Sequence, residues 1–124
     1  MANPNIVNVT SILGTTTYLT PANTTGNVLL SNASGSNLVF KVNNIVAANV
    51  TASAANTTVS IDNAAAGAGT DFPIVSTVSV PGNSSLIAVD KTTSFYLMEN
   101  QSIVVTSGTS SAITYTISYE SIAS

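Results

Sequence analysis

The stretch that decides the fold is residues 84–120, SSLIAVDKTTSFYLMENQSIVVTSGTSSAITYTISYE. It contains short runs rich in β-branched and aromatic residues, separated by turn-forming residues, at 86–89, 95–98, 103–106 and 113–119. The last run alternates apolar with polar side chains, the apolar positions being Ile113, Tyr115, Ile117 and Tyr119. Because strand side chains point to opposite faces with a period of two, this run predicts a strand with one apolar face and one polar face. Strands and short turns at this spacing are typical of an antiparallel sandwich or barrel.

The residues before this stretch supply the strands that would cover its apolar face. Further strand candidates lie at 6–13 continuing through 15–19, and at 28–30, 38–50, 59–61 and 74–80. Gly14 permits a bend or bulge in the first of them. Within 38–50 the apolar parity is interrupted at Asn43-Asn44, which predicts a bulge or corner, since an extra residue shifts the facing by one.

The connections are predicted from their turn residues. Residues 62–70, DNAAAGAGT, predict a flexible loop, and Pro81-Gly82 predicts a type II turn with positive φ at the glycine. No segment longer than a turn has helical periodicity. The sequence therefore predicts an all-β fold, a single antiparallel β-sandwich of about eight or nine strands with a jelly-roll-like arrangement. We expect residues 1–7 to form an N-terminal arm and residues 8–124 to form the sandwich domain.

The most unusual global property is the shortage of charge. Charged residues make up 6% of the 124 residues, against about 25% in ordinary globular chains, while hydrophobic residues make up an ordinary 44%. The surface must therefore consist largely of Ser, Thr, Asn, Gly and Ala. Such a surface has little like-charge repulsion to keep copies apart, which favours association. We expect a structural protein that works inside an assembly.

Charge and residue types also argue against several classes of function. A net charge of −3 without arginine argues against binding to nucleic acid or to an anionic membrane surface. No run reaches the roughly 18 apolar residues of a membrane span. The N-terminal residues lack the basic and apolar regions of a secretory signal, so we expect a chain made in the cytosol, or a mature product.

The residues available for catalysis are few. The absence of His and Cys excludes Ser-His-Asp and Cys-His arrangements. A Ser-Lys dyad would have to use Lys41 or Lys91, which sit in strand or turn patterns typical of solvated charge. Glycoside hydrolysis needs two carboxylates in one cleft. The carboxylates fall at loop or strand ends, where solubility explains them: Asp62, Asp71, Asp90, Glu99 and Glu120. We predict that the chain is not an enzyme and has no catalytic residues.

Metal and cofactor sites are not predicted. Zinc is disfavoured without His or Cys. Calcium binds carboxylate, amide and backbone oxygens, which the loop from Asp62-Asn63 to Asp71 has. The spacing does not match an EF-hand, and Gly67 and Gly69 are explained more simply by loop flexibility. The sequence thus leaves calcium open and predicts no cofactor.

The aromatic residues bear on glycan binding, which commonly uses exposed aromatic platforms. There is no Trp. Tyr115 and Tyr119 share the apolar parity of their strand, which predicts positions in the core. Tyr96 has the opposite parity to Phe95 and Leu97, so we expect it to face outward or into a partner.

Several segments of the chain, in order, resemble small virion structural proteins of tailed bacteriophages, especially those of marine and cyanobacterial hosts. These segments are ANPNIVNVTSILG (2–14), FKVNNIVAANV (40–50), SVPGNSSLIAVDK (79–91), FYLMENQSIVV (95–105) and TISYESI (116–122). The likeness spans nearly the whole chain in register. It departs from the family at one turn, where a Gly-Asp pair commonly follows the acidic residue and this chain has Asn100-Gln101 after Glu99.

The resemblance implies a β-sandwich accessory protein of the virion, with no catalytic or ligand residues to carry over. The leading hypothesis is a capsid decoration (cement) protein that stabilises the assembled head. The alternatives are a neck, tail or fibre accessory protein, and a host-surface glycan-binding module. The expected partners are the major capsid protein or other virion proteins, and other copies of the chain, with a trimer as the first expectation. The predicted interface residues, in an extended arm able to add to a sheet edge, are Ala2, Asn3, Pro4, Asn5, Ile6 and Val7.

The polar face of the last strand has a second interpretation in this setting. Thr114, Thr116 and Ser118 would form a solvated surface in an ordinary protein. Because the chain has so few charges, we also interpret this face as a candidate packing surface.

Overall fold

The computed structural model of the chain describes residues 7–123, which form β-strands and one short 3-10 helix. The elements in chain order are β1 (Ser11–Leu19), β2 (Asn27–Asn32), β3 (Leu38–Asn49), β4 (Ala55–Asp62), β5 (Asp71–Val80), β6 (Ser85–Val89), η1 (Lys91–Thr93), β7 (Phe95–Leu97), β8 (Gln101–Ser107) and β9 (Ile113–Ala123). The alternating run 113–119 is therefore a strand, β9, which extends four residues beyond Tyr119.

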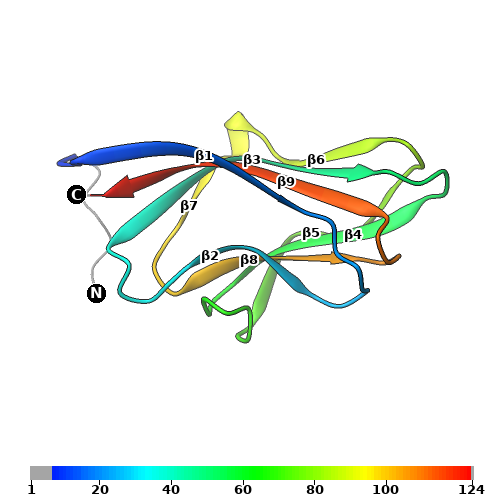
Figure 1. Cartoon of the computed structure of the whole chain (residues 1–124), viewed down its shortest axis with the longest axis horizontal. Coiled ribbons are helices and arrows are strands. Elements are labelled where there is room, and N and C mark those ends of the chain that lie inside the picture. Colours follow the sequence, from blue (N-terminus) through cyan, green and yellow to red (C-terminus); the bar gives the residue numbers. More distant parts are fainter. Residues whose placement is uncertain (1–6, 124) are drawn as a thin grey trace.

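The strands form two antiparallel sheets packed face to face (Figure 1). Sheet A has the order β1-β9-β3-β6, with β7 also paired to β3, and sheet B has the order β2-β8-β4-β5. The strand pairs are nested inside one another along the chain. The outermost pair is β1·β9, the next is β2·β8, then β3 pairs with β6 and β7, and the innermost pair is β4·β5. The chain thus runs as one long hairpin folded over on itself, which is the arrangement of a two-sheet jelly roll. This confirms the predicted all-β sandwich.

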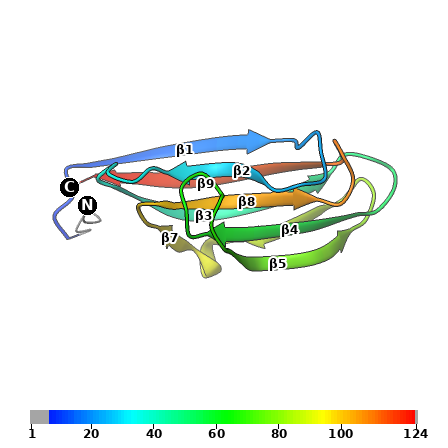
Figure 2. The ribbon, with the colours of Figure 1, turned by 90° about the horizontal axis from the view of Figure 1, so that it is seen from below.

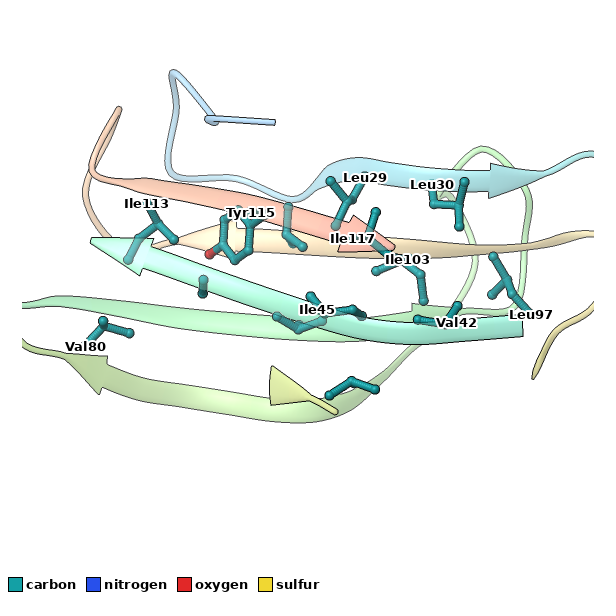
Figure 3. Packing of buried hydrophobic residues seen from close by; sticks show 14 of the residues in the cluster. Leu29, Leu30, Val42, Ile45, Val80, Leu97, Ile103, Ile113, Tyr115 and Ile117 are labelled. Atoms are coloured by element: carbon teal, nitrogen blue, oxygen red, sulfur yellow. The ribbon is translucent and has the colours of Figure 1, made fainter. Parts of the chain in front are cut away.

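The hydrophobic core lies between the two sheets (Figure 3). From β9, Ile113, Tyr115 and Ile117 point into it and have no solvent exposure. Sheet B contributes Leu30 and Ile103 from β2 and β8. Each such side chain contributes about 1.5–3 kcal/mol when fully buried. The alternation in the sequence of β9 therefore predicted correctly which of these side chains point into the core.

The two positions at which the sequence suggests or permits a bulge have different outcomes. The register of β3 against β9 shifts between Val42 and Asn44, which confirms the bulge at Asn43 and keeps Val42 and Ile45 both buried. Gly14 permits a bend or bulge, but no bulge forms there, because β1 pairs with β9 in unbroken register through that residue. The partner strand β9 is continuous there, and its pairing sets the register of β1.

The predicted type II turn at Pro81-Gly82 is wrong in detail. The left-handed residue is Asn83, with φ of 55°, and the turn closes one residue later through Ser84 N–H donating to Pro81 O at 3.2 Å. Asparagine tolerates this conformation better than most residues. Gly82 is required for another reason, since a Cβ there would lie 2.2 Å from Ala52 O.

Candidate interaction surface

The outer faces of the two sheets differ, because the loop of residues 63–70 covers part of sheet B. In Figure 2 this loop, between β4 and β5, crosses over β8 and β2. Ser102 Oγ on β8 donates to Ala64 O at 2.7 Å. A Cβ on Gly67, which has φ of 72°, would lie 2.9 Å from Val28 Cγ2. The segment predicted to be a flexible loop is therefore packed and hydrogen-bonded onto its own sheet.

The outer face of sheet A presents a row of side chains that runs across four strands. Tyr18 on β1 is the cross-strand partner of Thr116 on β9, which is also the partner of Val46 on β3, and Val46 pairs with Ile87 on β6. Tyr18 is 75% exposed and Ile87 is 62% exposed. We call this set the Tyr18–Ile87 row. The row has the large side chains of Tyr18 and Ile87 at its two ends, with Thr116 and Val46 between them.

Two further rows continue this face with hydroxyl, amide and opposite-charge pairs. Thr16 and Ser118 are cross-strand partners whose hydroxyls lie 3.0 Å apart. The next row places Lys41 opposite both Glu120 and Tyr96, which is 46% exposed. Because Lys41 and Glu120 carry opposite charges, this part of the face has little net charge. Opposite charges on cross-strand partners contribute about 0.2–1 kcal/mol. The prediction that Tyr96 faces outward is confirmed.

The predicted packing residues of β9 belong to this face. Thr114, Thr116 and Ser118 alternate with the buried Ile113, Tyr115 and Ile117 and are half-buried by their neighbours. Thr114 Oγ1 lies 2.8 Å from Thr20 Oγ1. The hydroxyls of Thr114 and Ser118 thus bond to the hydroxyls of Thr20 and Thr16.

Most of the predicted arm lies outside the described residues, namely Ala2, Asn3, Pro4, Asn5 and Ile6. Val7 is described, is 91% exposed and precedes β1. Within residues 7–123, β1 is an edge strand that pairs only with β9. The contact predicted for the arm stays a prediction.

The two tyrosines of β9 occupy the interior, as predicted from their parity. Tyr115 is fully buried, and its hydroxyl donates to Thr106 O at 2.9 Å and bonds to Thr57 Oγ1. Burial raises the pKa of the Tyr115 hydroxyl, and the hydrogen bond with Thr57 opposes that rise in part. Tyr119 is half-buried with its ring centroid 5.0 Å from that of Phe40.

Solubility does not explain all the carboxylates, because Asp62 has no solvent exposure. Its Oδ1 accepts from the N–H groups of Ala64 at 2.8 Å and Gly69 at 3.0 Å, so it organises the loop on sheet B. An aspartate that opens a glycine-rich loop is the signal that sequence reasoning missed. Asp90 is exposed and caps η1, and hydrogen bonding from Thr92 lowers its pKa.

Within residues 7–123 there is no detected pocket, no cluster of three or more metal-ligating His, Cys, Asp or Glu side chains, and no helix long and apolar enough to cross a membrane. Comparison of the chain with protein-family models, with curated proteins and with solved structures finds no match.

Proposed function

We propose that this chain is a non-enzymatic structural protein of a bacteriophage virion, which decorates the capsid and stabilises the assembled head. The observation that carries the proposal is the outer face of sheet A, where the Tyr18–Ile87 row and Tyr96 expose large apolar groups among hydroxyl side chains. The resemblance of the sequence to small virion proteins of tailed phages points in the same direction.

The composition of this face suits contact with another protein. Interface centres are enriched in Tyr and depleted in charged residues relative to the rest of a protein surface. Tyr18 and Tyr96 are exposed here, and the opposite charges of Lys41 and Glu120 lie on cross-strand partners.

The jelly-roll topology gives support of a weaker kind. Two-sheet jelly rolls occur in viral capsid domains, and also in lectin domains and cupins. Because one fold hosts many functions, the topology is an analogy and the face of sheet A carries the argument. A decoration protein acts by mass action: binding only the assembled lattice stabilises it according to affinity and free concentration.

The first test is the number of copies in purified particles encoded by the same genome, measured by quantitative mass spectrometry against the major capsid protein. Capsid decoration predicts on the order of hundreds of copies, whereas a neck or tail position would give about a dozen, as the symmetry of those sites dictates. Absence from the particles would refute a virion role.

The second test places a charge on the proposed contact face. Ile87→Lys adds an ammonium at the end of the Tyr18–Ile87 row, where a partner would have to desolvate it. We expect binding of the purified chain to undecorated capsids to weaken at least tenfold, which is about 1.4 kcal/mol. Ser79→Lys, at an exposed position of β5 in sheet B, is the matched control and should bind normally.

Equal binding by both lysine variants would contradict the assignment of the contact to sheet A. The same measurement on a chain lacking residues 1–7 tests the proposed arm contact, which undiminished occupancy would rule out.

A further inference from the structure

Most edge strands of the sandwich carry a feature that hinders pairing with another chain. An edge strand exposes unpaired N–H and C=O groups, and natural sheets protect it with short length, proline, bulges or a covering loop. β6 and β7 are five and three residues long. β5 contains Pro73, shifts register twice against β4 and holds Thr77 at a φ of 51°. β2 shifts register once against β8, and the loop of residues 63–70 packs against it through Ser31.

β1 is the exception among these edges. It is nine residues long, contains neither proline nor a charged residue, and pairs with β9 in unbroken register. Figure 2 shows β1 along one margin of the molecule, and within residues 7–123 no strand pairs with its outer edge. Three of its side chains are large and more than half exposed, namely Ile12, Leu13 and Tyr18. A long, regular and uncharged edge of this kind is a template for a further strand.

The sequence of β1, SILGTTTYL, is complementary to a second copy of itself. In the antiparallel register that pairs all nine residues, Thr15 lies opposite the partner's Thr15 on a twofold axis. Ile12 then lies opposite the partner's Tyr18, and the symmetry makes this contact twice. Ile12 and Tyr18 are an even number of residues apart, so both point to the outer face of sheet A. Pairs of an aromatic with a β-branched residue, and of Thr with Thr, stabilise neighbouring strands.

Charge and backbone hydrogen bonding both favour a second copy as the occupant of this edge. Because β1 carries no charge, two identical strands place no like charges opposite each other, although each copy has a net charge of −3. In an antiparallel ladder every second residue pair exchanges two hydrogen bonds, so nine pairs form about eight to ten. A protein interface of ordinary size has about ten. The edge alone is therefore long enough to hold two copies together.

We propose that two copies of this chain pair through β1 in antiparallel orientation, so that their two sheets A join into one continuous sheet. The outer faces of the two sheets A then lie on the same side of the dimer. This inference concerns the chain by itself and does not depend on the virion role. A twofold pair is a dimer, whereas the resemblance leads to the expectation of a trimer, so the oligomeric state distinguishes the two.

The first experiment is sedimentation equilibrium of the purified natural chain from ~1 µM to ~1 mM, where a monomer–dimer equilibrium is expected. Ile12→Lys should raise the Kd of the dimer at least about tenfold, because each dimer loses two apolar contacts and gains two lysines at the paired edge. Phe72→Lys is the matched control. Phe72 is likewise more than half exposed, but it lies on β5, the edge of sheet B, so this variant should dimerise like the natural chain.

Single cysteines test the register, because the natural chain has no cysteine. Directly opposite residues in antiparallel strands have Cα atoms about 4.5–5.5 Å apart, which is within the range of a disulfide. Thr15→Cys should therefore give a crosslinked dimer under mild oxidation. Ile12→Cys should not crosslink to itself, because the two copies of position 12 lie six residues apart along the paired strands, about 20 Å.

A monomer at every concentration up to ~1 mM, or a trimer, would overturn the proposal. Equal weakening by Ile12→Lys and Phe72→Lys would overturn it as well, as would crosslinking of Ile12→Cys as efficient as that of Thr15→Cys. A chain lacking residues 1–7 should still dimerise. Loss of the dimer in that chain would show that the N-terminal arm holds the copies together and that β1 does not pair with β1.

Discussion

The Tyr115 hydroxyl joins the two sheets across the core, so removing it alone is an informative perturbation. In Tyr115→Phe the ring still fills its place on β9, but Thr57 Oγ1 on β4 and Thr106 O on β8 lose a buried partner. Leaving a buried polar group unsatisfied costs about 1–3 kcal/mol. We therefore expect a loss of about 1–3 kcal/mol in the free energy of unfolding. For a domain of this size that lowers Tm by about 3–6 °C for each kcal/mol.

The assay is urea unfolding followed by fluorescence or circular dichroism, with the m-value checked for constancy. Tyr18→Phe is the matched control, because Tyr18 is 75% exposed, and it should change stability by less than about 0.5 kcal/mol. Combining Tyr115→Phe with Thr57→Val should cost less than the sum of the single changes, since the two hydroxyls bond to each other. A loss in Tyr115→Phe no larger than in the Tyr18 control would refute this account of the core.

The raised pKa of Tyr115 gives the same variant a pH signature. A tyrosine whose pKa is higher in the folded chain stabilises it fully below the unfolded pKa of about 10. That contribution is lost as the pH rises through the folded pKa. We expect the natural chain to lose stability more steeply above pH ~10 than Tyr115→Phe does. Parallel curves would contradict the assignment.

Two further predictions concern single residues that hold the turns. Asn49→Ala removes a buried side chain that donates to Val80 O at 3.0 Å and makes three other hydrogen bonds. The variant should lose about 2–4 kcal/mol in the free energy of unfolding, measured in urea, and a loss below about 1 kcal/mol would contradict this. Gly82→Ala forces a Cβ to within 2.2 Å of Ala52 O and should lower Tm by several degrees. The control is Gly14→Ala, whose Cβ would meet no atom within 4 Å, and it should leave Tm unchanged or raise it. Equal shifts of Tm in the two variants would refute the steric argument.

Local patterns predicted the strands well, because burial with a period of two is a property of single strands. The alternation in β9 and the bulge at Asn43 are both visible within a dozen residues of sequence. The unbroken pairing of β1 through Gly14 is not visible in the local sequence, because its register is set by Glu120, on a strand more than a hundred residues away. Similarly, Gly82 is explained by Ala52, on a different connection.

The candidate surface was predictable only in part for the same physical reason. The parity of Tyr96 predicted its exposure, and the hydroxyl face of β9 was recognised from sequence. The Tyr18–Ile87 row needs the registers of four strands at once, and these pairings are long-range. The buried state of Asp62 depends on the loop that folds back over sheet B, which the composition DNAAAGAGT describes only as glycine-rich.

The nested pairing of the strands has a consequence for how the chain is synthesised and folds. β9 lies between β1 and β3, and β8 lies between β2 and β4, so β1 and β2 have no hydrogen-bonding neighbour until the last two strands exist. Thr10 bonds to Ala123 across 113 positions of sequence. Contacts of this range slow folding, into milliseconds to seconds for comparable β-proteins. A ribosome therefore exposes two unpaired strands through most of translation. Premature termination before residue 101 would leave both β1 and β2 open to aggregation, and termination between residues 107 and 113 would leave β1 alone unpaired.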